Sequence, residues 1–353
     1  MKTKIAIASA FIAASSFSTA EIVVNDFLSF EGFVDMSYTH TDTEFDGANA
    51  NGNSFAIDQV EISWLFDFDT VTAQIDFDYE DNAPDVTEVE QAFATYHFDN
   101  GGAITAGRYA SMLGFEAFEP TGLYQYSFGY DMEFGDTSVL PGYAQGVKYT
   151  QESDTTFFGI SLQDEAFDNG NNALGGNPGS TFAVEVAGGY YMENGLSFFL
   201  GGVYEDGNNA DNMVINAYTT FETGAWIFAA EVNYGDLESG GALNTAAGGI
   251  FAGASVANEE VLQFLLMANF AYSDQASITG RFTYTDHEGD LNFGGDAVAD
   301  AMKFTLAHGY AFTDNLFLVT EISYVDGSYD TDFPGFSADF DALEGAVELI
   351  FSF

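Results

Sequence analysis

Apolar and polar side chains alternate with a period of two along most of this chain. In "VTAQIDFDYE" (71–80), the odd positions are apolar or aromatic and the even positions are polar or acidic. Successive side chains of a β-strand point to opposite faces, so this pattern predicts a strand with one apolar face. The segment 55–68 alternates in a similar way, and Asp69-Thr70 between the two makes a tight turn. Together the two segments predict an antiparallel hairpin.

About sixteen such segments follow one another, which is the even count and the length of strand expected of a transmembrane antiparallel β-barrel. Connections after the even-numbered segments are short, whereas those after the odd-numbered segments are mostly long and rich in Gly, Asn and Asp. In outer-membrane barrels, short periplasmic turns alternate with long external loops in this way, and both chain ends lie on the periplasmic side. The predicted strands are 28–40, 55–68, 71–80, 87–98, 102–110, 143–151, 155–163, 181–191, 196–204, 213–222, 225–234, 259–272, 276–285, 300–311, 316–325 and 343–353.

Alternation alone also fits a soluble β-sandwich or β-solenoid, which would bury its apolar face in a core. Aromatic residues near the strand ends favour the membrane barrel, because they match the aromatic girdles at the two membrane interfaces. We therefore expect outer-membrane lipid and lipopolysaccharide around the barrel. These residues are Tyr38, Trp64, Phe68, Tyr79, Trp226, Tyr234, Tyr272, Tyr284, Tyr310 and Tyr324.

The last segment, "LEGAVELIFSF", alternates in the same way and ends on Phe353. A terminal strand that ends in Phe resembles the signature by which the barrel-assembly machinery recognises outer-membrane porins. We therefore expect that machinery to be a partner of the chain through Phe353.

The first twenty residues have two lysines, an apolar stretch from Ile5 to Ala14 and a small-residue site that ends at Ala20. This is the pattern of a secretory signal peptide (1–20), and the apolar stretch is too short for a membrane anchor. We expect an exported chain whose residues 21–353 form a single outer-membrane β-barrel domain.

The charge is strongly unbalanced, with 55 acidic residues against 6 basic residues and a formal net charge of −49. Nucleic acid is excluded as a partner, because its phosphates require Lys and Arg, and cations are favoured instead. The 37 Phe and 19 Tyr argue against disorder, and the absence of cysteine excludes disulfides and thiol chemistry. Outside the signal peptide the basic residues are Arg108, Lys148, Arg281 and Lys303.

The longest connection, about 111–142, is unusually aromatic for an external loop. An aromatic loop in solvent would expose a large apolar surface, so we expect this third loop to fold back into the lumen and to narrow it. An external lid packed on neighbouring loops is the alternative. The aromatic residues of this loop are Phe115, Phe118, Tyr124, Tyr126, Phe128 and Tyr130.

The basic residues are expected to face the lumen, because a charge that faces lipid near the bilayer centre is costly. Arg108 and Lys148 lie on the predicted strands that flank the third loop, and Arg281 and Lys303 lie on later strands. A cationic wall opposite an acidic loop would set up a transverse field at the constriction. Alternatively, these bases neutralise neighbouring lumen acids. The acidic residues of the loop are Glu116, Glu119, Asp131, Glu133 and Asp136.

Acidic residues are far more numerous on the predicted lumen face, and rings of carboxylates favour the passage of cations. Adaptation to high salt, which screens charges over a few ångströms, is an alternative reason for the acidity. These residues are Glu31, Asp35, Glu61, Asp67, Asp76, Asp78, Glu80, Glu90, Glu185, Glu231, Glu321, Glu344 and Glu348.

No catalytic motif is found, and the four histidines show no spacing typical of metal ligands. We therefore expect neither an enzyme nor a dedicated metal site, and no cofactor. Acidic loops such as 326–332 could hold Ca²⁺ or Mg²⁺ weakly, but none has the spacing of a calcium-binding loop, so a solvated acidic loop is favoured.

Four stretches of the first half share the pattern of a known family, namely "LSFEGFVDMSYTHT", "FAIDQVEISW", "VEQAFATYHFDNGGAITAGRYASMLGFEAFEP" and "QGVKYT". They include the step Gly107-Arg108-Tyr109 followed by Gly114-Phe115-Glu116. With these stretches the first half of the chain resembles the OmpL-like family of bacterial outer-membrane β-barrel porins. The resemblance implies an outer-membrane channel, and the second half matches it only in its general barrel pattern.

The sequence predicts an outer-membrane porin for the passive diffusion of small hydrophilic solutes and ions, with a preference for cations. Two alternatives stay open. The first is a substrate-specific channel for sugars or peptides, and the second is a largely plugged structural or adhesion barrel of the envelope. A homotrimer is compatible with all three, since porins commonly form trimers.

Overall fold

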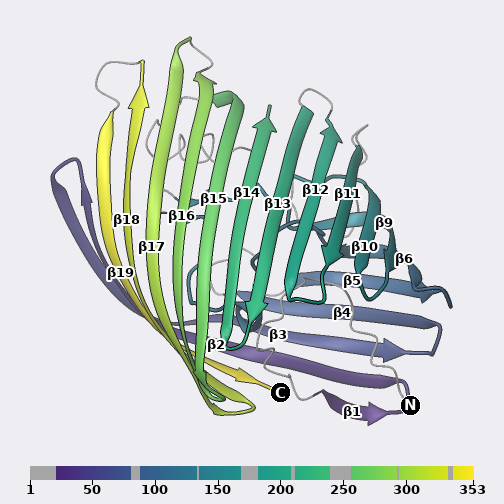
Figure 1. Ribbon diagram of the computed structural model, residues 1–353. Helices are drawn as coiled ribbons and strands as arrows, with labels where there is room; N and C mark the ends of the chain where they lie inside the picture. Colours follow the sequence, from purple (N-terminus) through teal and green to yellow (C-terminus); the bar gives the residue numbers. More distant parts are fainter. Residues whose placement is uncertain are drawn as a thin grey trace.

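The computed structural model describes residues 21–80, 88–132, 135–167, 182–207, 211–238, 256–291, 294–332 and 337–353. The predicted signal peptide lies outside the described residues. Sixteen long antiparallel strands form one closed all-β barrel (Figure 1), which confirms the predicted fold class. The strands are β2 (Leu28–Phe45), β3 (Ala48–Asp67), β4 (Val71–Glu80), β5 (Glu88–His97), β6 (Gly102–Ala110), β9 (Tyr143–Glu152), β10 (Thr156–Gln163), β11 (Phe182–Tyr191), β12 (Leu196–Asp206), β13 (Asp211–Thr223), β14 (Trp226–Leu237), β15 (Val256–Ser273), β16 (Ala276–Leu291), β17 (Asp296–Thr313), β18 (Leu316–Thr331) and β19 (Ala338–Ser352).

The barrel closes where β19 pairs with β2. The amide of Gly32 donates to the carbonyl oxygen of Phe353 at 2.8 Å, and the amide of Phe353 donates to the carbonyl oxygen of Gly32 at 2.9 Å. A Cβ atom on residue 32 would lie 2.4 Å from the carbonyl oxygen of Glu61, so the seam requires glycine. A short strand that the alternation does not predict, β1 (Ile22–Asn25), pairs with β2 near the seam. Closure gives each long strand two neighbours, as a sheet in lipid requires.

Several strands extend further towards the long connections than the alternation predicts. β2 and β3 meet at the two-residue turn Asp46-Gly47, whose φ angles of 48° and 77° are left-handed. Most of the predicted long loop between 40 and 55 is therefore a hairpin. The backbone ladder does not depend on side-chain polarity, so the strands continue after their apolar face has ended. The alternation marks the apolar band of the barrel and not the strand ends.

The two faces of a strand differ in exposure, as the alternation predicts. In β17, Phe304 and Leu306 are 50% and 56% exposed, whereas Lys303 and Thr305 are 1% and 5% exposed. The outer face is therefore apolar, and the polar side chains point inwards.

Helix is almost absent from the described residues, where one short 3₁₀ turn, η1 (Pro120–Gly122), precedes the small hairpin of β7 (Asp131–Met132) and β8 (Gly135–Asp136). No helix in this part of the chain is long and apolar enough to cross a membrane.

Two β-bulges interrupt the strand ladders close to one another in the wall. On β3, Gln59 pairs with Asp35 and Ile57 with Met36, so Asp58 is an extra residue. On β5, Gln91 and Val89 pair with neighbouring residues of β4, and Glu90 is likewise left without a partner in the ladder. A bulge bends the strand and re-aims its side chains. In both places the extra residue is acidic.

Candidate pore constriction

The segment 111–142, which connects β6 to β9, lies against the inward face of the barrel wall and contacts several of its strands. Its first part is held by wall carboxylates. The amide of Met112 donates to Oε1 of Glu185 on β11 at 2.5 Å, and the amide of Phe115 donates to Oε1 of Glu231 on β14 at 2.7 Å. Both glutamates are almost fully buried. The carboxylates accept hydrogen bonds from backbone donors that would otherwise be buried without a partner.

The middle of the same segment is held by a third wall carboxylate. Oε2 of Glu321 on β18 accepts hydrogen bonds from the amides of Tyr126 and Ser127 at 2.8 and 3.1 Å. The hydroxyl of Ser127 donates to the other oxygen of Glu321 at 2.6 Å. We call Glu185, Glu231 and Glu321 the anchoring carboxylates, because each holds a part of the segment against a different strand.

Arg281 on β16 joins two parts of the segment. Its Nη1 lies 2.6 Å from Oε1 of Glu116 and donates to the carbonyl oxygen of Ser127 at 2.7 Å. Its Nη2 donates to the hydroxyl of Ser127 and to the carbonyl oxygen of Phe128. The other oxygen of Glu116 accepts a hydrogen bond from the amide of Gly129. A buried guanidinium with this many partners fixes the fold of the segment as well as its position.

The other three basic residues also have partners on the inner face. Nζ of Lys303 lies 2.9 Å from Oε2 of Glu344 and donates to the carbonyl oxygen of Asp131 at 3.0 Å. Nζ of Lys148 donates to the carbonyl oxygen of Ala110 and lies 4.4 Å from the centre of the Tyr109 ring.

Arg108 lies on β6, where its Nε donates to the carbonyl oxygen of Glu90 at 2.9 Å. Its guanidinium carbon lies 5.8 Å from the centre of the Tyr143 ring. The preceding residue, Gly107, has a φ of 135°, and a Cβ atom there would lie 2.2 Å from the carbonyl oxygen of Ala92. Glycine at 107 therefore allows β5 and β6 to approach at the point where Arg108 crosses to β5.

The acidic residues of the segment do not share one environment. Glu116 is paired with Arg281, whereas Glu119 accepts hydrogen bonds from Nε2 of Gln59 at 2.9 Å and from the hydroxyl of Tyr143 at 3.0 Å. Burial, followed by the Glu90 carboxylate nearby, raises the pKa of Glu119 to about 8.

The remaining predicted acids of the segment are only partly described. Asp131 begins β7, which pairs with β8. The backbone of Asp136 lies in β8, and Glu133 lies outside the described residues.

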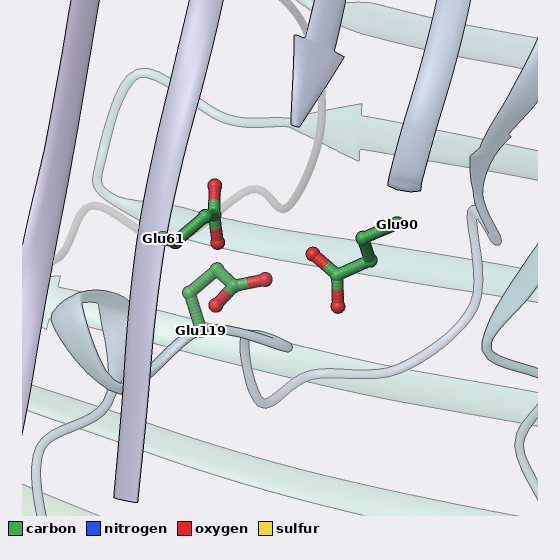
Figure 2. Close-up of side chains that lie close together, drawn as sticks. All are labelled: Glu61, Glu90 and Glu119. Atoms are coloured by element: carbon green, nitrogen blue, oxygen red, sulfur yellow. The ribbon is translucent and has the colours of Figure 1, made fainter. Parts of the chain in front are cut away.

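Oxygens of Glu61 on β3, Glu90 on β5 and Glu119 lie within 4.8 Å of one another. Figure 2 shows the three carboxylates facing one another between the two strands and the segment. The structure thus brings together two wall residues and one segment residue that are far apart in the sequence.

A cavity of about 280 Å³ lies between the segment and the wall formed by β2, β3, β5 and β19. Five carboxylates line it, and none of the described lining residues is lysine or arginine. The carboxylates belong to Asp35, Asp58, Glu90, Asp131 and Glu348. Aromatic side chains line the same cavity, namely Phe118, Tyr126, Phe128 and Tyr143.

The other predicted site residues lie on the inner side of the wall or within the segment. Asp76 on β4 accepts hydrogen bonds from Gln74 and Gln91, and Asp78 on the same strand is buried. Phe115 packs edge-on against Tyr218, with ring centres 6.0 Å apart.

The aromatic residues further along the segment have polar contacts. The hydroxyl of Tyr130 donates to Glu231 at 3.2 Å, and the carbonyl oxygen of Tyr124 accepts a hydrogen bond from Thr279.

Sequence reasoning missed two features of this site. Asp58 lies at a bulge, and a simple alternation places it on the lipid side of β3. The signal is present in "FAIDQVEIS", where Phe55 and Ile57 are followed by two polar residues and then by Val60 and Ile62. The apolar positions change from odd to even there, which indicates a bulge. The structural role of the anchoring carboxylates has no comparable signal, because their donors are backbone amides distant in sequence.

A closed sixteen-stranded barrel with an apolar outer face and a polar inner face is the architecture of an outer-membrane porin-like channel. The chain belongs to the family described as "Putative beta-barrel porin-2, OmpL-like", whose model matches residues 28–353. The match confirms the resemblance seen in the first half and extends it over the second. The family and the fold are those of non-enzymatic channels, as the sequence predicts.

Solved structures with the same fold include three outer-membrane proteins. The channel DcaP of Acinetobacter baumannii has a TM-score of 0.63 and 13% identity, covering 92% of this chain and 97% of that chain. The anion-selective porin from Comamonas acidovorans has a TM-score of 0.60 and 13% identity, covering 92% and 99%. The trimer form of in-vitro folded OmpT from Vibrio cholerae has a TM-score of 0.58 and 14% identity, covering 93% and 100%. At these identities the likeness concerns the fold alone. No curated protein matches the chain.

Proposed function

We propose that the chain is a passive diffusion channel for small hydrophilic solutes and ions, narrowed by the segment 111–142 and selective for cations. The observation that carries this proposal is the cavity beside the segment. Five carboxylates line this cavity, and no basic residue is among its described lining residues. Carboxylates along a narrow path attract cations and repel anions.

The positions of the basic residues support the same selectivity. Arg281 and Lys303 are paired with Glu116 and Glu344, and Lys148 is packed on Tyr109. The charges of these three residues are therefore engaged in ion-pair and cation–π contacts within the segment and the wall. The anchoring carboxylates are occupied by backbone amides, so the acids that govern permeation are those that face the cavity.

Purified, refolded protein in planar bilayers tests this proposal. We expect single-channel conductance and, under a KCl gradient, a reversal potential of the sign that cation selectivity gives. The double variant Asp35→Asn, Glu348→Gln should move the reversal potential towards zero. Glu193→Gln, at an exposed turn residue, neutralises one carboxylate away from the cavity and should leave the reversal potential unchanged.

The possible outcomes separate the alternatives. A folded barrel without conductance would contradict the channel and favour a plugged structural or adhesion barrel. A reversal potential of the opposite sign would contradict the cation selectivity while leaving the channel in place.

A substrate-specific channel is a second candidate, because Phe118, Tyr126 and Phe128 line the same cavity as the carboxylates. Exposed ring faces bind sugars and organic cations by stacking and by cation–π attraction. Blockade of the ion current by one class of sugar or peptide at low concentration would support this candidate. Equal, weak effects of all classes would support general diffusion.

The partners that we propose follow from the outer face and the chain end. The apolar outer face is in contact with outer-membrane lipid and lipopolysaccharide, and the barrel-assembly machinery recognises Phe353. A homotrimer is supported by the trimer form of OmpT from Vibrio cholerae, and cross-linking in native membranes tests it.

A further inference from the structure

Glu61, Glu90 and Glu119 come from three separate elements, and their carboxylates converge in Figure 2. One oxygen from each lies within 4.8 Å of the other two. The bulge in β5 leaves Glu90 outside the strand ladder and so allows its side chain to reach this point. Gln59 and Tyr143 orient Glu119 towards the same place by donating one hydrogen bond to each of its oxygens.

The three carboxylates have hydrogen bonds but no counter-charge among the described residues. The hydroxyl of Ser63 donates to Oε1 of Glu61 at 2.7 Å, and Glu119 has the two donors named above. Glu61 is only 6% exposed, and its Oε2 is buried with no hydrogen-bond partner. Oε2 of Glu90 is in the same situation. Within the described residues, the ion pairs of the protein join other side chains, and none includes Glu61, Glu90 or Glu119. Unpaired carboxylates at this spacing repel one another, and burial adds the cost of desolvation.

A divalent cation bound between the three carboxylates would cancel their repulsion and offset the cost of their burial. Carboxylate oxygens are the preferred ligands of hard cations, and Ca²⁺ binds its ligands at 2.3–2.6 Å. Ligands on opposite sides of a Ca²⁺ ion are therefore up to about 5 Å apart, which accommodates the observed spacing. Water molecules complete such a coordination shell, since Ca²⁺ takes six to eight oxygens.

We propose that Glu61, Glu90 and Glu119 form a Ca²⁺ site that joins the segment 111–142 to the wall at β3 and β5. Glu119 is the ligand from the segment, and the two wall glutamates are the ligands from the barrel. Gln59 and Tyr143 are positioning residues, because they hold Glu119 through hydrogen bonds. Arg281 and the anchoring carboxylates hold the segment to β11, β14, β16 and β18, and the ion adds an attachment to β3 and β5.

The site is tested by calorimetric titration of CaCl₂ into the refolded, chelator-treated full-length protein in detergent with about 0.15 M KCl, which screens weak surface binding. We expect one Ca²⁺ bound more tightly than the rest. Glu119→Gln and, independently, Glu61→Gln should each weaken it by more than about tenfold, because a charged ligand is lost. Glu193→Gln, at an exposed turn, removes one carboxylate elsewhere and should leave the tight site unchanged.

Folding of each variant is checked by its heat-modifiable migration in gels, so a binding defect is not confused with a folding defect. A wild-type titration without a distinct tight site would overturn the proposal. So would tight binding retained by the triple variant Glu61→Gln, Glu90→Gln, Glu119→Gln. The titration does not depend on conductance, so failure of this site and failure of the channel function are separate results.

Discussion

The guanidinium of Arg281 lies 2.6 Å from the carboxylate of Glu116, although the two residues are 165 positions apart in the sequence. Arg281 is on the wall at β16, and Glu116 is in the segment that connects β6 to β9. The Arg281 side chain is fully covered, and that of Glu116 is largely covered. This pair fixes where the segment crosses the barrel.

Removal of Arg281 should therefore be costly. In Arg281→Met the buried Glu116 carboxylate loses its counter-charge, and the loss of one partner of a buried pair costs about 3–5 kcal/mol. Urea unfolding in lipid vesicles, followed by tryptophan fluorescence, measures this change. The double variant Arg281→Met, Glu116→Gln should recover part of the stability, because no unpaired charge is then left. If the loss of unfolding free energy in the double variant equals the sum of the losses in the two single variants, a direct interaction is contradicted.

The attachment at Glu321 can be tested through the accessibility of the segment. The chain has no cysteine, so Leu123→Cys introduces a single thiol at a buried position of the segment. In Glu321→Ala we expect a water-soluble maleimide to label it at least about tenfold faster, since one hydrogen bond to a charged group contributes about 1.5–3 kcal/mol. Glu193→Ala should leave the rate unchanged. An unchanged rate in Glu321→Ala would show that this contact does not hold the segment.

Gly107 and Gly280 offer a matched pair of substitutions in the wall. A Cβ atom at 107 would meet the backbone of Ala92 at 2.2 Å, in a conformation with φ of 135°, whereas a Cβ atom at 280 would meet nothing within 4 Å. Gly107→Ala should lower stability by at least about 1–3 kcal/mol. Gly280→Ala should be close to neutral. Equal folded yields of the two variants after refolding would contradict the close approach of β5 and β6.

Variants at the two residues of the seam, Gly32 and Phe353, distinguish an effect on folding from an effect on assembly in cells. Gly32→Ala places an atom against the backbone of β3, so it should lower the folded yield both in detergent and in cells. Phe353→Ala keeps the backbone hydrogen bonds of the seam, so it should refold in detergent like the wild type. If the assembly machinery recognises this residue, the same variant should give less folded protein in the outer membrane. Wild-type levels in cells would contradict that recognition.

The strand number could be predicted because lipid and water impose a period of two on every strand. The ends of β2 and β3 could not, since their hydrogen-bond ladder continues to Asp46-Gly47 beyond the apolar band. The bulge at Asp58 leaves a readable change of phase in the apolar positions, which simple alternation overlooks. The bulge at Glu90 leaves no such clear signal, because Phe93 has the same odd parity as Val89.

The position of the segment 111–142 is harder to predict from the sequence than the strands are. Its aromatic character argues against exposure, but the partners of its backbone amides are chosen by three-dimensional proximity. Glu321, for example, lies more than 190 positions from the amides that it accepts. Local pattern contains no information about such pairs, so these contacts could not be predicted from the sequence.

Among the described residues of the segment, five backbone amides donate to side chains of the wall, namely those of Met112, Gly114, Phe115, Tyr126 and Ser127. The wall thus recognises the course of the main chain, in addition to side chains of the segment such as those of Glu116, Ser127 and Tyr130. Every residue other than proline has a backbone amide whatever its side chain, so these five hydrogen bonds can persist when the residues that donate them are substituted. This part of the attachment therefore tolerates changes of sequence in the segment, during evolution or in the laboratory.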